Sequence, residues 1–157
     1  MARHTLTARR ESASEATTQV AEQLGVPKIL GGSPSLIKVH EVLYAGLPRR
    51  AMLNAIPEGF PMPELLAAFG ISLRTFMRLK ADPAKRLDPD QSARVWRFAE
   101  LLAKAEDVLG SRARAVEWML EPAMALEKRR PVDLLTTTVG AQLVDDVIER
   151  LRYDVYQ

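Results

Sequence analysis

Two arginines four residues apart carry the clearest chemistry in this sequence. Arg74 and Arg78 lie on a predicted helix that begins at Ser72, and their spacing places both side chains on one face, with Thr75 beside them. A guanidinium group can donate two parallel hydrogen bonds to a guanine edge or to a phosphate. The pair therefore indicates a nucleic-acid contact, although exposed arginines are also common on helices that bind no DNA.

Catalytic chemistry finds little support in the sequence. Adjacent carboxylates such as Asp145 and Asp146 point about 100° apart on a helix, so they cannot flank one bond as an acid and a base. The chain has no cysteine and only two histidines, His4 and His40, which provide neither a zinc cage nor a thiol nucleophile. We therefore expect no enzymatic activity, no metal site, no cofactor and no small-molecule substrate.

The end of the chain forms a second candidate site. The predicted last helix has an apolar stripe at steps of three and four: Val144, Val147, Ile148, Leu151 and Val155. Its other face is polar and predicted to point to solvent: Gln142, Asp145, Asp146, Glu149 and Arg152. Tyr153 and Tyr156 follow within the last five residues, and this favours a protein partner, because an unpartnered terminus frays and gains nothing from aromatic side chains. The alternative is that both tyrosines pack onto their own domain.

Helices are predicted to position both candidate sites. A short helix from Pro63 to Phe69, a turn at Gly70 and a helix capped by Ser72 have the spacing of a helix-turn-helix. A capping box at Asp88 starts a long helix that ends at Gly110. Further helices are predicted to begin at Pro48, Ser111, Pro131 and Thr137. Since no stretch alternates like a strand over more than a few residues, we predict an all-α fold.

The N-terminal segment is rich in Thr, Ala, Ser and Glu. We predict a flexible arm here, with at most a short helix from Ala16 to Leu24. Ser33-Pro34 is predicted to start the first core helix, which stops at Gly46. We divide the chain into three parts: a flexible arm, 1–32; a helix-turn-helix domain, 33–86; and a helical C-terminal domain, 87–157.

The long predicted helix has a broad apolar face that includes Trp96, Phe98, Leu101 and Leu102. Such a face fits a central strut of the domain or a seam between two copies. We predict a homodimer through this face, because a major-groove reader gains affinity by placing two copies on successive turns of the duplex.

Charge and composition point to two partners. The 157 residues leave room for one domain or one domain and a small module, with a formal net charge of +2. Residues 49–86 carry seven basic side chains against three acidic ones, whereas residues 131–157 carry five acidic against two basic. The absence of cysteine suits a reducing cytoplasm, and no apolar run is long enough to span a bilayer. We expect a cytoplasmic protein with no membrane partner.

Six segments from Gly46 onward occur in an order that is typical of one family. They read GLP, LLAAFGISLRTFMRLK, RLDPDQSARVWRFAELLAKAEDVLG, AVEWMLEP, RPVDLLTTTVG and RLRYDVYQ. Their order and spacing extend over about two thirds of the chain. This order resembles the Xre/MbcA/ParS group of antitoxins, the partners of RES-domain toxins in bacterial toxin–antitoxin pairs. The first two segments are general to helix-turn-helix proteins, and the later ones are more specific.

The resemblance implies an Xre-like DNA-binding helix-turn-helix followed by a helical toxin-binding and dimerisation domain, in a homodimer that binds operator DNA and represses its own operon. The partner would be a RES-domain enzyme that destroys NAD, with its active site occluded by the C-terminal segment. The implied DNA-binding residues are Ser72, Arg74, Thr75, Arg78 and Lys80. The implied toxin-binding residues are Arg150, Tyr153, Asp154, Val155, Tyr156 and Gln157.

The sequence departs from the family pattern in two places. Ala123 and Glu127-Lys128 stand where relatives usually have Asn and a Gly-Gly turn, and Asp154 stands where they usually have Gly. We therefore expect the turn near Glu127 and the exit of the tail from its helix to differ.

Two other functions fit parts of the sequence. A stand-alone transcription regulator with a C-terminal dimerisation domain shares every feature up to Gly110, but it does not explain the aromatic end. A helical adaptor that binds a protein and no DNA is favoured if Arg74 and Arg78 are paired with acids in the fold.

Overall fold

The computed structural model describes residues 2–31 and 35–155, with residues 2–10 described by their backbone alone. This part of the chain contains no strand, so the predicted all-α fold is confirmed. None of the helices it describes is both long and apolar enough to cross a lipid bilayer. The helices are α1 (Ala2–Gln23), α2 (Pro27–Leu30), α3 (Leu36–Ala45), α4 (Arg49–Asn54), α5 (Met62–Phe69), α6 (Leu73–Ala81), α7 (Pro89–Leu109), α8 (Arg112–Leu120), the 3₁₀ turn η1 (Met124–Leu126), α9 (Pro131–Leu134) and α10 (Thr138–Val155).

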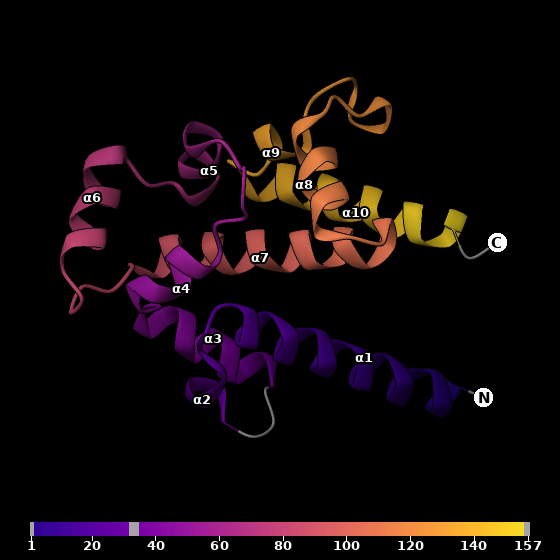
Figure 1. Ribbon diagram of the computed structural model, residues 1–157. Coiled ribbons are helices and arrows are strands. Elements are labelled where there is room, and N and C mark those ends of the chain that lie inside the picture. The colour runs from indigo at the N-terminus through magenta and orange to yellow at the C-terminus, as the bar shows by residue number, and fades with distance from the viewer. Residues whose placement is uncertain (1, 32–34, 156–157) are drawn as a thin grey trace.

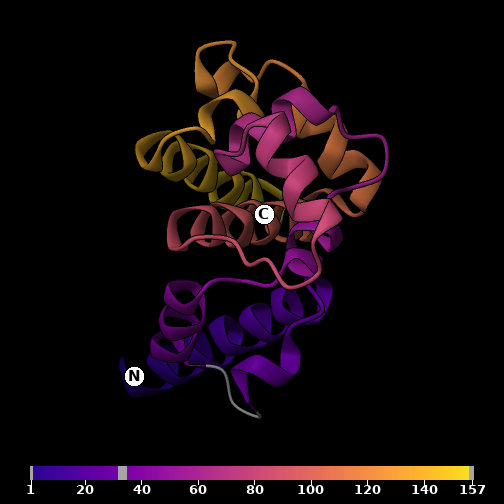
Figure 2. The same ribbon diagram turned by 90° about the vertical axis from the view of Figure 1, so that its left-hand side faces the viewer.

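The long helix α7 lies at the centre of the fold (Figure 1). It begins with the predicted capping box, in which the Gln91 amide N donates to Asp88 Oδ1 at 2.8 Å and the Asp88 amide N donates to Gln91 Oε1 at 3.1 Å. Helices α1 to α3 lie on one side of α7, and α5 and α8 to α10 lie on the other, in both views (Figures 1 and 2). The core therefore surrounds α7.

This arrangement explains the broad apolar face of α7 and corrects one prediction. The proposed dimer seam residues Trp96, Phe98, Leu101 and Leu102 are 6%, 1%, 3% and 0% exposed. Phe98 packs edge-on against Phe60 and Phe69, with ring centroids 5.4 and 5.3 Å away. A dimer seam through these residues is wrong, because helices of the same chain already cover them on two sides.

The N-terminal segment also differs from its prediction. It forms one helix of 22 residues, α1, and not a flexible arm with a short helix. Its last turns join the core, where Val20, Ala21 and Leu24 are nearly inaccessible to solvent. No Gly or Pro interrupts the chain between Ala2 and Leu24, so nothing in the backbone opposes a continuous helix. The predicted cap at Ser33-Pro34 lies outside the described residues, and Ser35 caps α3 by accepting from the Lys38 amide at 3.2 Å.

The turn after η1 holds two residues in the left-handed region. Glu127 has φ 55° and Lys128 has φ 64°, at the turn where the resemblance implied a Gly-Gly pair. This turn therefore takes a conformation that suits glycine, although the chain supplies two long side chains.

Replacing Lys128 by Gly should stabilise the protein. A left-handed residue with a Cβ costs about 1–2 kcal/mol and the added freedom of Gly in the unfolded chain costs about 0.5–1 kcal/mol, so we expect a gain of about 0.5–1 kcal/mol. Urea denaturation of Lys128→Gly measures the change. The matched control is Ala125→Gly in the same turn, which should lose stability because Ala125 has no positive φ. A loss of stability in Lys128→Gly would contradict the account of this turn.

Candidate functional site

Helices α5 and α6 form the predicted helix-turn-helix. Gly70 ends α5 in the left-handed conformation, φ 65°, with its amide bonded to the carbonyls of Ala67 and Leu66. Ile71, 5% exposed, fills the corner between the helices. Ser72 then caps α6, because its Oγ accepts from the Thr75 amide at 3.1 Å.

Helix α6 has a buried face and a basic outer face. Phe76 and Leu79 point into the core, whereas Arg74 and Arg78 are exposed together on the opposite side. Within the described residues, neither arginine forms an ion pair with an acidic side chain. The condition that favoured an adaptor without DNA binding is therefore not met.

The other predicted DNA-binding residues lie at the two ends of α6. The hydroxyls of Ser72 and Thr75 are 3.0 Å apart, so both take part in the cap of the helix. Lys80 is exposed in the last turn, and its carbonyl accepts a hydrogen bond from Arg49 Nη1, which ties α4 to the end of α6. The structure brings all five residues together on one helix and its cap, and their contact with DNA stays a prediction.

Apolar packing and ion pairs both hold the last helix, α10, in the domain. Its inner residues Val144, Val147 and Ile148 are buried. Gly140 is also buried, where a Cβ would lie 1.9 Å from the carbonyl O of Leu134. The close approach of α9 to α10 therefore requires a glycine at this position.

Charged residues that were predicted to face solvent form the edge of this contact. Lys104 Nζ of α7 lies 2.7 Å from Asp145 and 3.9 Å from Glu149. Further along α10, Arg152 forms an ion pair with Asp107 of α7, with Arg152 Nη2 lying 3.3 Å from Asp107 Oδ2. The prediction that Asp145, Glu149 and Arg152 point away from the protein is thus wrong. Sequence reasoning missed these pairs because charge on a helix flank does not identify a partner about forty residues away.

Beyond Arg152, the end of α10 is exposed. Tyr153 is 65% exposed and Val155 is 62% exposed. Tyr153 therefore does not pack onto its own domain, and Val155, the last residue of the predicted apolar stripe, is exposed. The helix continues through Asp154 to Val155, so the tail does not leave it at the position where the resemblance implied Gly. The predicted toxin-binding residues Tyr156 and Gln157 lie outside the described residues.

The sixth residue of this predicted set, Arg150, is exposed one turn before Tyr153, and its Nε donates to the Asp146 carbonyl at 3.3 Å. Two further apolar side chains that sequence reasoning missed, Val139 and Leu143, are 73% and 46% exposed on the same helix. Residues 139, 143, 146, 150 and 153 follow one another at steps of four and three, so they form one stripe along the helix. The outer surface of α10 therefore offers apolar side chains at both ends and polar ones between.

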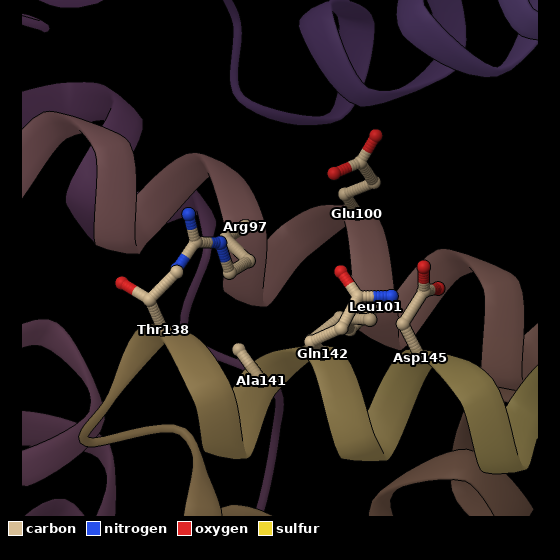
Figure 3. A pocket seen from close by; sticks show the side chains of 7 residues that line it. All are labelled: Arg97, Glu100, Leu101, Thr138, Ala141, Gln142 and Asp145. Atoms are coloured by element: carbon tan, nitrogen blue, oxygen red, sulfur yellow. The ribbon is translucent and has the colours of Figure 1, made fainter.

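A small pocket marks the seam between α7 and α10 (Figure 3). Arg97 and Glu100 of α7 line it with Thr138, Gln142 and Asp145 of α10. Burial raises the pKa of the Glu100 carboxyl above its ordinary value of 4.5, and the nearby Lys104 ammonium offsets part of this rise. Glu100 is thus a carboxylate that the fold holds in a partly desolvated place.

Replacing Glu100 by Gln should stabilise the protein at neutral pH. Because the pKa is raised in the folded state, the contribution of Glu100 to stability is full below about 4.5 and is lost as pH rises through the raised folded value. The advantage of Glu100→Gln should therefore be present at neutral pH and shrink as pH falls toward 4.5. Denaturation across this pH range measures it, with the exposed Glu117→Gln on α8 as control. A wild type that is more stable than Glu100→Gln at neutral pH would contradict this reading.

The two candidate sites lie at opposite ends of α7: α6 stands at one end, and the C-terminal end of α10 lies near the other (Figure 1). The fold and these sites define a helix-turn-helix protein with a second, C-terminal helical domain. Comparison with known proteins gives the same division. Residues 39–100 match the family described as the antitoxin Xre-like helix-turn-helix domain, and residues 104–153 match the antitoxin Xre/MbcA/ParS C-terminal toxin-binding domain. The chain therefore belongs to the Xre/MbcA/ParS group.

Three curated relatives are similar to this chain, and each bears the name antitoxin Xre. The protein of Yersinia enterocolitica is 36% identical over 97 residues, and that of Photorhabdus laumondii is 29% identical over 97 residues; each match covers 61% of this chain and 65% of the relative. The protein of Pseudomonas putida is 31% identical over 78 residues, which cover 50% of this chain and 48% of the relative. The matches thus span less than two thirds of the relatives' length.

Proposed function

We propose that this protein is the antitoxin of a type II toxin–antitoxin pair. The observation that carries the proposal is the end of α10, where Tyr153 and Val155 are exposed on a helix that ion pairs and apolar packing hold firmly up to Arg152. A rigid helix that presents aromatic and aliphatic side chains is suited to enter a concave surface of a partner. The name of the C-terminal family, a toxin-binding domain, supports the same reading.

The partner that we propose is a RES-domain toxin that degrades NAD. The antitoxin would block it by placing Tyr153, Asp154, Val155 and the residues after them at the mouth of the active site, with Arg150 at the edge of the contact. This identity rests on the resemblance of the closing RLRYDVYQ segment to antitoxins that accompany such toxins. We propose a cytoplasmic location, because this protein would bind operator DNA and a toxin that acts on NAD.

We further propose that the protein represses its own operon as a homodimer. The basic outer face of α6 supports DNA binding, because Arg74 and Arg78 are exposed and free of ion pairs in the described part of the chain. The distance of this face from the end of α10 leaves room for DNA and toxin to bind together (Figure 1). A stand-alone regulator shares the DNA contact but assigns no role to the exposed end of α10.

Co-expression tests the proposal. A RES-domain protein encoded beside this gene should stop growth when expressed alone, and growth should resume when this chain is co-expressed. The two proteins should also co-purify as one complex. Unrelieved toxicity in the presence of the folded chain, or the absence of a complex, would overturn the antitoxin function and favour the stand-alone regulator.

A further inference from the structure

Helix α3 presents exposed apolar side chains on a face that no element in the described part of the chain covers. Among its ten residues only Val39 and Val42 are buried. On the opposite side, Ile37 is 69% exposed and Tyr44 is 72% exposed. The His40 and Tyr44 rings are stacked with their centroids 6.2 Å apart, so the two rings lie side by side on this face. Exposed apolar faces of this kind mark places where a partner binds.

The four residues at the centre of this face are arranged symmetrically along the helix. Ile37, His40, Glu41 and Tyr44 follow the spacing i, i+3, i+4 and i+7, and they therefore share one side of α3. A two-fold axis through the middle of this set would pack two copies of α3 in antiparallel orientation. It would place Ile37 against the partner's Tyr44 and His40 against the partner's Glu41, each pair occurring twice.

We infer that α3 is the interface of the homodimer, with a second copy of this chain as the occupant. The inference rests on the homodimer of the proposed function and names its surface. The pairing buries aliphatic on aromatic side chains. Glu41 already pairs with Lys38 Nζ of its own helix at 3.5 Å, and the partner's imidazole N–H would give its carboxylate a second donor, so two copies of this face complement each other. DNA is a poorer occupant, because Glu41 would repel phosphates from the middle of the face.

The position of α3 agrees with the rest of the molecule. It lies on the side of α7 opposite to α8, α9 and α10, so a dimer through α3 leaves the toxin-binding end free (Figures 1 and 2). The face is one helix of ten residues, which is small for a protein interface. We therefore expect a dissociation constant on the order of micromolar in the absence of DNA.

Sedimentation of the full chain across the micromolar range tests the inference. The wild type should show a reversible monomer–dimer equilibrium, and Ile37→Glu should weaken it at least about tenfold, since two carboxylates would be buried against apolar partners. Val139→Glu on α10 is the matched control, because it places the same charge on an exposed apolar residue, 73% exposed, on the other side of α7 and should leave the dimer intact.

A charge exchange makes the test specific to the predicted pairing. His40→Glu should weaken the dimer, because the new carboxylate would face the partner's Glu41, and adding Glu41→Lys to it should restore association. Circular dichroism confirms that each variant is folded, as expected for exposed positions. A wild type that is monomeric throughout would contradict the homodimer itself. A dimer that survives Ile37→Glu, or a charge exchange without rescue, would overturn α3 as its surface and leave the antitoxin function untouched.

Discussion

Removal of Tyr153 to Gln157 should abolish protection against the toxin while leaving the fold and DNA binding intact. The cut is placed after Arg152 because Arg152 bonds to Asp107 of α7 and so belongs to the structure of the domain. The removed residues that are described contribute little to the core: Tyr153 is 65% exposed and Val155 is 62% exposed. Growth of cells that co-express the toxin measures protection, and thermal unfolding and a gel shift measure the rest.

Single substitutions should show how much each tail residue contributes to binding of the toxin. As an aromatic anchor in a partner pocket, Tyr153→Ala should cost on the order of 2 kcal/mol or more of binding free energy. Asp154→Ala is the comparison, and we expect a smaller loss because a helical carboxylate beside the anchor fills no pocket. A truncated chain that still protects cells would place inhibition elsewhere, most plainly on the outer stripe of α10 with Val139 and Leu143. The stand-alone regulator forecasts no toxin phenotype for any of these variants.

Replacing both Arg74 and Arg78 by Ala should reduce operator binding by tenfold or more. Each base contact of an arginine fork is worth about 1–3 kcal/mol, and each lost phosphate contact lowers the slope of log affinity against log salt by about 0.9. Thermal stability should barely change, because both side chains are exposed and make no ion pair in the described part of the chain.

The control for this pair removes the same charge elsewhere. Arg114 on α8 and Arg129 after η1 are exposed in the C-terminal half, and replacing both by Ala should leave operator binding nearly unchanged. Titration of the promoter region at two salt concentrations distinguishes the pairs. Equal affinity of the Arg74→Ala, Arg78→Ala variant and the wild type would remove α6 as the DNA-binding helix.

Local signals in the sequence predicted the helix boundaries well. Ser72, Asp88 and Ser111 were predicted as caps, and each accepts the backbone hydrogen bond of a cap in the structure. Such signals depend on residues three apart, and a sequence contains them directly. The all-α fold and the helix-turn-helix followed from the same local rules.

The errors concern contacts between distant parts of the chain. The composition of α1 resembles a disordered arm, and only the packing of Val20 and Leu24 onto the core shows why it is ordered. Likewise, the apolar face of α7 is equally consistent with a strut and a dimer seam, and the buried Phe98 decides for the strut. The exposed face of α3 escaped notice because its pattern looks like that of any core helix until Ile37 and Tyr44 are seen to point outward.

The consumption of NAD by the purified RES-domain toxin tests the central claim most directly. Titration with the full chain should slow NAD loss until it stops when the toxin is saturated. The chain that ends at Arg152 should leave NAD loss unchanged at the same concentrations. Continued NAD loss in the saturated complex with the full chain would contradict the claim that this protein is an antitoxin that blocks the active site of an NAD-degrading enzyme.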